Sequence, residues 1–373
     1  MLYWLFVDPG PMADVVPGAN VFRYLTFRTA WAVITALAIA YVAFPPFISW
    51  MQRRKVEQII RSDGPESHLL SKVGTPTMGG MVLIGALCGS TLLWARLDQP
   101  AIWAALGVTA GYGLIGLVDD WIKVMSGKPE GLAGRYKILG QLVFGGGILG
   151  WAYGSGIVDA NVALPFFKDA SIPFGEPWHN APAWLGWSYV VFGMFVLTAM
   201  SNGVNLTDGL DGLAIGPTMT SAATLGVMAY VAGNAKFSAY LGIPYVDGAG
   251  ELMVMALAIV GSGLGFLWYN AYPAQVFMGD VGSLALGGAL GILGLLSGQA
   301  LLLPVVGGIF VLESVSVILQ VASFKMTGKR LFRMAPIHHH YEKLGWSEPK
   351  IIVRFWVISI VLALVALSTL KLR

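Results

Sequence analysis

Long apolar runs alternate with short polar connections along almost the whole chain of 373 residues. A run of about 17 to 25 apolar residues is long enough to cross a bilayer as a helix. At that length the pattern predicts ten helices, near residues 25–48, 77–96, 101–118, 138–155, 185–201, 212–233, 252–270, 283–299, 302–323 and 351–370. The stretch 156–184 breaks the pattern with proline, aromatic and turn-forming residues, which predicts a short hairpin between the fourth and fifth helices. We therefore expect an all-α polytopic membrane protein that forms one domain over residues 1–373.

The composition excludes an ordinary soluble domain. Hydrophobic residues make up 56% of the chain and charged residues only 12%, whereas soluble domains carry about 25% charged residues. The single cysteine, Cys88, lies inside an apolar run, which excludes an internal disulfide and favours a small buried side chain.

Basic residues gather in some odd-numbered connections, which predicts how the helices are oriented. The even-numbered connections are nearly bare, and the first, third and ninth carry Arg53, Arg54, Lys55, Arg61 and Lys72; Lys123, Lys128, Arg135 and Lys137; and Lys325, Lys329, Arg330, Arg333, Lys343 and Lys350. Because cytoplasmic loops of membrane proteins are enriched in Lys and Arg, the odd-numbered connections should be cytoplasmic. Both termini and the hairpin should then face outward.

The fifth connection contains a polar, glycine-rich stretch, SNGVNLTDGLDGLA, over residues 201–214. Asn205, Asp208 and Asp211 are spaced three apart, so they share a face wherever the backbone is helical or turn-like. Gly203, Gly209 and Gly212 in the same stretch allow a ligand or another helix to approach the backbone closely. One acid could cap the sixth helix, but three polar groups exceed what capping requires. The stretch predicts a metal or phosphate site.

Two further acidic motifs lie on connections that should be cytoplasmic. Asp119 and Asp120 are adjacent at the predicted end of the third helix, where two carboxylates repel each other and need a cation, a base or a raised pKa. A solvated helix end is the alternative, although negative charge there opposes the helix dipole. Asp280 has no cationic partner in its own loop and therefore either caps the eighth helix or binds a metal. The hard-oxygen set suits Mg²⁺ and comprises Asp119, Asp120, Asp208, Asp211 and Asp280.

The remaining candidates are a lysine and a group of histidines. Lys72 stands just before the second helix, where it could bind phosphate or anchor a lipid headgroup. The consecutive histidines 338–340 cannot all face one way, so one or two should hydrogen-bond a phosphate or sugar and another should be structural; a metal site or an incidental polar loop are the alternatives. Glu313 and Gln320 lie seven apart on one face of the ninth helix, where polar residues are functional candidates, although a structural hydrogen bond is as plausible for Glu313.

Five motifs, in this order and on these connections, resemble one known family: TPTMGG, GLVDDWIK, NLTDGLDGLA, FMGDVGSLALGG and APIHHHYEKLGW. They are similar to the polyprenyl-phosphate N-acetylhexosamine-1-phosphate transferases, over essentially the whole chain. The triple histidine followed by WSEPKIIVRFW favours the branch whose donor is UDP-MurNAc-pentapeptide. The resemblance implies a Mg²⁺-dependent transferase of the bacterial inner membrane, with periplasmic termini and a cytoplasmic active-site cleft. It would convert this donor and undecaprenyl phosphate into lipid I and UMP for peptidoglycan synthesis. It also implies a homodimer in the lipid bilayer and no nucleic-acid partner.

The same resemblance implies roles for individual residues. Asp280 would be the main Mg²⁺ ligand with Asp208 as a second ligand, and Asp119 and Asp120 would handle the lipid phosphate, Asp119 accepting its proton. Phe277 would stack on uracil, although an aromatic residue there is as often packing. The substrate-binding set would comprise Lys72, Thr77, Asn205, Asp208, Asp211, Asn270, Phe277, Gln320, His338, His339 and His340.

Three other functions compete with this interpretation. A sister transferase that uses UDP-GlcNAc is disfavoured by the histidine-rich loop. An ion-coupled transporter would place its acids near the bilayer midplane, whereas these acids lie at predicted cytoplasmic helix ends. A receptor or scaffold would not need Mg²⁺-type carboxylates. Whether the transfer is one displacement or passes through an aspartyl-phosphate stays open, and our hypothesis is direct displacement.

Overall fold

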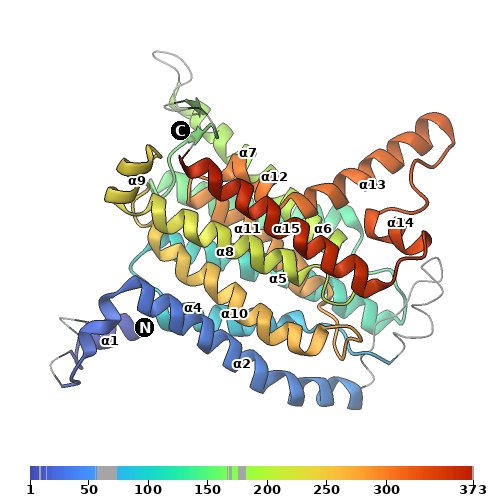
Figure 1. Ribbon diagram of the computed structural model, residues 1–373, viewed down its shortest axis with the longest axis horizontal. Helices are drawn as coiled ribbons and strands as arrows, with labels where there is room; N and C mark the ends of the chain where they lie inside the picture. Colours follow the sequence, from blue (N-terminus) through green and yellow to red (C-terminus); the bar gives the residue numbers. More distant parts are fainter. Residues whose placement is uncertain are drawn as a thin grey trace.

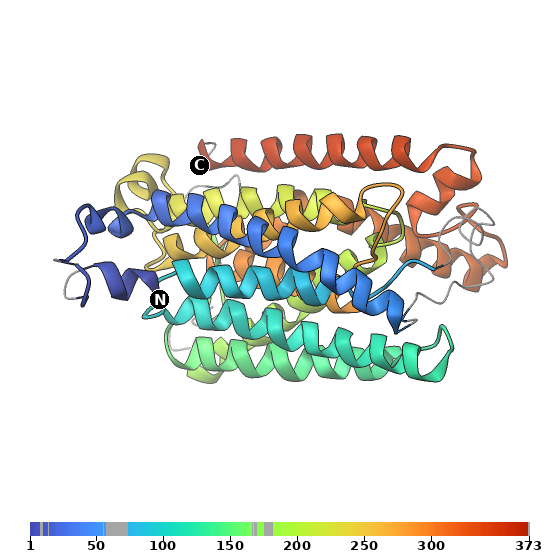
Figure 2. The same cartoon turned by 90° about the horizontal axis from the view of Figure 1, so that it is seen from below.

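A computed structural model describes residues 1–7, 10–13, 15–54, 56, 74–165, 167, 170–174 and 182–371. Ten helices of 15 or more residues occur among them, and each overlaps one of the ten predicted ranges (Figures 1 and 2). These are α2 (Leu25–Arg53), α4 (Gly80–Trp94), α5 (Pro100–Ser126), α6 (Gly134–Gly154), α7 (Trp187–Thr207), α8 (Ile215–Ala232), α10 (Leu252–Asn270), α11 (Gly279–Leu296), α13 (Gly308–Thr327) and α15 (Glu348–Ser368). Within the described residues, seven helices are long and apolar enough to cross a membrane. The helical, polytopic class is confirmed, and the number of spans stays a prediction.

Shorter elements connect these helices. The predicted hairpin is confirmed: β1 (Asn161–Ala163) and β2 (Ser171–Pro173) pair antiparallel between α6 and α7, with Val162 opposite Ile172. The other short helices are α1 (Leu2–Phe6), α9 (Ala235–Leu241), α12 (Leu303–Val306) and α14 (Ile337–Lys343), with 3₁₀ turns at Ala19–Arg23, Ala183–Gly186, Ala249–Glu251, Ala300–Leu302 and Thr369–Lys371. Both termini lie at one end of the bundle and α14 at the other (Figures 1 and 2).

The centre of the bundle is α11. Every residue from Val281 to Leu296 is buried, and α5 and α7 form its most extensive helix contacts. Small residues let these helices approach closely: a Cβ at Gly287 would overlap the backbone of Met200 and Ser201 on α7. The close packing fixes the first turn of α11 against its neighbours.

Several helix boundaries differ from the sequence prediction by a few residues or more. The third predicted helix ends near residue 118, but α5 continues to Ser126 and stops where Gly127 adopts a left-handed conformation (φ 64°). Asp119 and Asp120 therefore lie inside the helix. Both side chains are buried, so they are not at a solvated helix end. The ninth predicted helix, 302–323, is interrupted, since α12 ends before Gly307 and α13 begins at Gly308.

Candidate active site

Three carboxylates from two helices meet at one point, and we call them the carboxylate cluster: Asp119, Asp120 and Asp280. One oxygen from each lies within 4.8 Å of the others. Asp119 and Asp120 come from α5 and are 0% and 3% exposed, while Asp280 is the second residue of α11. The helices can meet here because Gly116 has no side chain: a Cβ at this position would overlap the carbonyl group of Asp280. The predicted Mg²⁺-type set also included Asp208 and Asp211, and the fold brings three of the five acids together, Asp119, Asp120 and Asp280.

Two lysines bridge the cluster. Lys137 of α6 places Nζ 2.6 Å from Oδ2 of Asp280 and 3.0 Å from Oδ1 of Asp119. Lys123 of α5 places Nζ 2.5 Å from Oδ2 of Asp119, 3.4 Å from Oδ1 of Asp120 and 3.3 Å from Oδ2 of Asp280. The two ammonium groups offset two of the three negative charges. Sequence reasoning gave neither lysine a role, although Lys123 follows Asp119 by one helical turn; no spacing signal points to Lys137.

Backbone amides also bind the cluster. The N–H of Val281, in the first turn of α11, donates to Oδ2 of Asp120 (3.2 Å), and the N–H of Leu132 donates to Oδ1 of Asp119 (2.6 Å). A Cβ at Gly131 would overlap the Asp119 carboxylate, so the connection between α5 and α6 lies directly on it. The amides and lysines together compensate for the burial of these charges.

Asn205 links the 201–214 stretch to the cluster. Its Nδ2 donates to Oδ1 of Asp280 (3.0 Å) and to Oγ of Ser283 (2.8 Å). One turn earlier on α7, Ser201 accepts a hydrogen bond from Gln141 of α6 (3.0 Å) and donates to the carbonyl of Leu284 (2.9 Å). This chain of polar contacts aligns α6, α7 and α11 behind the carboxylates.

Asp208 and Asp211 lie beyond the cluster. Among the described residues, the group of carboxylates close enough to share a metal does not include them. Asp208 is the C-cap of α7, and Oδ2 of Asp211 accepts the N–H of Ala274 (3.0 Å). Oδ1 of Asn270 accepts the N–H of Gly212 (2.9 Å). Asn270 thus ties the stretch to the turn after α10, a structural contact that does not test its predicted role in binding.

The segment with Thr77 pairs with the segment that leads into α11. The N–H of Phe277 donates to the carbonyl of Pro76, and the N–H of Gly79 donates to the carbonyl of Phe277, both at 2.8 Å. Thr77 is buried between them and Phe277 is half-buried. The motifs TPTMGG and FMGDVGSLALGG are therefore hydrogen-bonded to each other at the N-terminal end of α11. Lys72 lies outside the described residues.

The three histidines contact three different partners. His338 and Glu313 of α13 are both fully buried, with Nδ1 3.1 Å from Oε1. Nδ1 of His339 lies 2.5 Å from Oε2 of Glu342. Nδ1 of His340 accepts the backbone N–H of Arg333 (3.1 Å).

Packing around α14 distinguishes residues that hold this segment in place from residues that are still partly exposed. The ring of His338 lies against Gly209, where a Cβ would overlap its Nε2, so α14 packs directly on the 201–214 stretch. Gln320 accepts the N–H groups of Leu331 and Phe332 (3.0 and 2.8 Å) and donates to the carbonyl of Phe332 (3.0 Å). His338 and Gln320 thus hold the segment around α14 in place, and His339 and His340 are only partly buried.

The cluster has the donor chemistry of a divalent-cation site. Carboxylate oxygens are the protein ligands that Mg²⁺ prefers, and three of them converge here. The adjacent ammonium groups suit phosphate oxygens. Together these groups can bind and polarise a phosphorylated substrate.

Comparisons with known proteins agree with this chemistry. The model of glycosyl transferase family 4 matches residues 102–298, a segment that begins on α5 and includes the whole cluster. A phospho-N-acetylmuramoyl-pentapeptide-transferase from Pelobacter propionicus is 52% identical over 373 residues, which is 100% of each chain. The chain therefore belongs to glycosyl transferase family 4 and, within it, to the phospho-N-acetylmuramoyl-pentapeptide-transferases.

Proposed function

We propose that this protein transfers phospho-MurNAc-pentapeptide from UDP-MurNAc-pentapeptide to undecaprenyl phosphate, giving lipid I and UMP. The observation that carries the proposal is the buried carboxylate cluster with its two bridging lysines, in a chain that is 52% identical to a transferase of that name. Because the acceptor is a lipid, the transferase would work in the bacterial inner membrane, which the seven apolar helices support.

Asp280 would be the main Mg²⁺ ligand, and Asp120 beside it would be a second. The ion would supply charge neutralisation for the phosphates of the donor and acceptor. Asp208 lies outside the cluster and would reach the ion through water or through the donor's phosphates. The hydrogen bond from Asn205 to Asp280 supports this, since it brings the 201–214 stretch next to the cluster.

In the proposed reaction an oxygen of the lipid phosphate attacks the sugar-linked phosphorus. A new P–O bond forms to that oxygen, and the bond to the UMP oxygen breaks, so that UMP leaves with the electron pair. Asp119 accepts the proton that the attacking phosphate still carries. Lys123 and Lys137 stabilise the charge that develops on the transferred phosphate, because both ammonium groups already point into the cluster.

The donor would extend from the cluster toward α14. Asn205, Asp208 and Asp211 would bind the nucleotide and its diphosphate, together with Lys72 and Thr77, and Phe277 would stack on uracil. His339 and His340 would contact the sugar-phosphate side, while His338 and Gln320 would position the loop. The contact between His338 and Gly209 supports this arrangement, since α14 lies against the 201–214 stretch.

The site would face the cytoplasm. Lys123 and Lys137 lie on the helices that flank the connection between α5 and α6, which the basic-residue pattern predicts to be cytoplasmic, and α14 lies at the end of the bundle opposite both termini (Figure 2). The termini would then be periplasmic. A single domain and a homodimer are further parts of the proposal, which rest on the family resemblance.

The test measures UMP release by the purified protein in detergent with undecaprenyl phosphate, UDP-MurNAc-pentapeptide and Mg²⁺. We expect release that EDTA abolishes and Mg²⁺ restores. Single changes Asp119→Asn, Asp120→Asn and Asp280→Asn should each lower the rate by roughly 10²-fold or more, since each removes a carboxylate that would hold Mg²⁺ or accept the proton. Folded wild-type protein that releases no UMP would overturn the proposal.

Two variations of the assay address the competing functions. UDP-GlcNAc as the only donor should give far slower UMP release; a faster rate than with UDP-MurNAc-pentapeptide would instead identify the sister transferase. Incubation with donor and no lipid should leave the protein unphosphorylated. A trapped phosphate on Asp280 would contradict direct displacement.

A further inference from the structure

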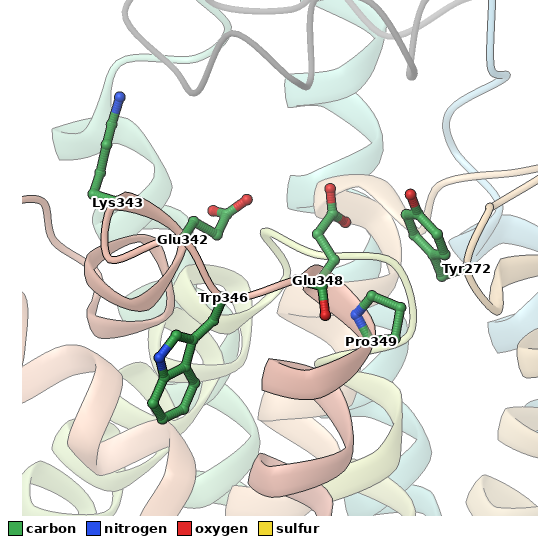
Figure 3. A pocket seen from close by; sticks show the side chains of 7 residues that line it. Tyr272, Glu342, Lys343, Trp346, Glu348 and Pro349 are labelled. Carbon is green, nitrogen blue, oxygen red and sulfur yellow. The ribbon is translucent and has the colours of Figure 1, made fainter.

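Two of the side chains that line the cavity between the turn after α10 and the connection from α14 to α15 have partners of their own (Figure 3). Glu342 pairs with His339, while Trp346 stacks on Tyr341 and is covered by the guanidinium of Arg354. These contacts hold α14 and α15 together. They serve the packing of that segment, whereas a second set of polar groups lies directly behind the carboxylate cluster.

This second set lies one helical turn from the cluster, and we call it the Gln141 layer. Lys137, Asn205 and Asp280 each have a counterpart in the layer, four residues away on the same helix. The counterparts are, in the same order, Gln141 of α6, Ser201 of α7 and Leu284 of α11. The layer also includes Tyr112 of α5 and Asn202 of α7. Because residues four apart on an α-helix lie on one face, contacts that fix the layer also fix the groups in front of it.

Gln141 connects the layer through both ends of its amide. Its Nε2 donates to Oγ of Ser201 (3.0 Å), and its Oε1 accepts from Nδ2 of Asn202 (2.9 Å). Ser201 donates in turn to the carbonyl of Leu284 (2.9 Å), and the phenol of Tyr112 donates to the backbone carbonyl of Gln141 (3.0 Å). Gln141, Ser201 and Tyr112 are each 0% exposed. The layer therefore joins α5, α6, α7 and α11, the four helices that carry the carboxylate cluster and the groups bound to it.

These contacts determine how α6 lies against α7. Ser201 and Asn202 are consecutive, so their side chains leave α7 about 100° apart, and a single amide group binds both. Rotation or sliding of α6 would break at least one of these bonds and leave a buried polar group without its partner, which is unfavourable. Lysine has a long, flexible side chain, so the position of the Lys137 ammonium depends on where α6 places its backbone.

We propose that Gln141 is a positioning residue for the transfer reaction. It sets the rotation and height of α6 against α7 and α11, and so holds the ammonium group of Lys137 at 2.6 Å from Oδ2 of Asp280. The proposal rests on the proposed function, because it gives Gln141 a part in that reaction. Gln141 acts through Lys137 and not on the substrate. Loss of its amide therefore impairs stabilisation of the transferred phosphate while leaving donor binding intact.

The test is a double-mutant cycle of Gln141→Met and Lys137→Met, since methionine keeps the length of the glutamine side chain without its amide. Ser201→Ala is a milder change to the same layer. Gln299→Met is the matched control: Gln299 is 3% exposed and donates to the carbonyl of Ser297 (3.4 Å) in the connection between α11 and α12. The measurements are kcat and KM for UMP release by full-length protein with UDP-MurNAc-pentapeptide, undecaprenyl phosphate and Mg²⁺, with thermal unfolding as a check of folding.

We expect Gln141→Met to lower kcat about tenfold or more while KM for the donor stays within about twofold of wild type, because only the transition-state contact is displaced. Ser201→Ala should lower kcat in the same way by about threefold, and Gln299→Met should leave it unchanged. In the Lys137→Met background, Gln141→Met and Ser201→Ala should each cost less than about twofold, because the group that the layer positions is already gone.

The proposal is overturned if folded Gln141→Met keeps the wild-type kcat, if Gln299→Met loses as much, or if the loss is equally large with and without Lys137. The same outcomes for Ser201→Ala decide the question if Gln141→Met does not fold. Absence of UMP release from folded wild-type protein would instead refute the proposed function and, with it, the reaction that Gln141 serves.

Discussion

A single methyl group at position 116 should separate the two halves of the carboxylate cluster. Gly116 of α5 faces the first turn of α11, where a Cβ would overlap the Asp280 carbonyl and lie 2.5 Å from the nitrogen of Val281. Both neighbours are backbone atoms, so no side chain can rotate out of the way. In Gly116→Ala the helices must move apart by roughly 1 Å, and a misplacement of that size can cost about 10²-fold in rate.

Gly113→Ala is the matched control on the same helix. A Cβ there would meet Ala285 of α11 at 3.4 Å, which is ordinary contact. Alanine also favours a helix over glycine by up to about 1 kcal/mol. We therefore expect Gly113→Ala to keep UMP release within about threefold of wild type, since no group in the cluster moves.

The assay compares UMP release by both variants across a Mg²⁺ titration. Gly116→Ala should be slow at every Mg²⁺ concentration while remaining folded, because the spacing of Asp119 and Asp120 from Asp280 has changed. A folded Gly116→Ala protein with wild-type activity would refute the reasoning, since the close approach of α5 and α11 would then not set the geometry of the reaction. Equal losses in both variants would refute it too.

Three further substitutions test other contacts. Asn205→Ala removes the amide that binds Asp280 and should lower kcat about tenfold; an unchanged kcat would contradict its role in holding that carboxylate. Lys137→Met removes the shortest lysine contact to Asp280 and should lower UMP release roughly 10²-fold even at saturating Mg²⁺, whereas recovery at high Mg²⁺ would show that the lysine serves only as a counter-ion. Arg28→Met leaves Glu251 buried without its cation near the termini and should lower the free energy of unfolding by about 3–5 kcal/mol while leaving kcat unchanged at low temperature; unaltered denaturant unfolding would be the contrary result.

Apolar periodicity predicted where the helices lie, because each membrane-length run must satisfy its backbone hydrogen bonds internally. The periodicity did not predict where a helix ends when polar residues continue the helix beyond its apolar run. The third helix was predicted to end near 118, since Asp119, Asp120 and Lys123 interrupt the apolar run, yet α5 continues through them to Ser126. The spacing of Asp119 and Lys123, which marks an ion pair along a helix, becomes readable only once that continuation is known.

The sequence did not predict which residues from distant segments contact one another. The chemistry of Asp119, Asp120 and Asp280 identified them as candidates, but their convergence depends on the packing of Gly116 against α11. The role of Lys137 depends on how α6 packs against α5, which no local pattern encodes. Likewise, the triple histidine predicted different roles for its members, and only the structure shows that His338 faces Glu313.

The charge balance of the cluster links its architecture to the proposed chemistry. Three carboxylates and two lysines leave one net negative charge in a largely buried place, which by itself repels a donor diphosphate and a lipid phosphate. A divalent cation would reverse the sign of the site and so permit both anions to enter. Removal of one acid therefore changes two properties at once, the number of metal ligands and the charge that the lysines must balance. The three carboxylates lie on α5 and α11, and the two lysines lie on α5 and α6. The packing of these three helices therefore sets the positions of all five charged groups together.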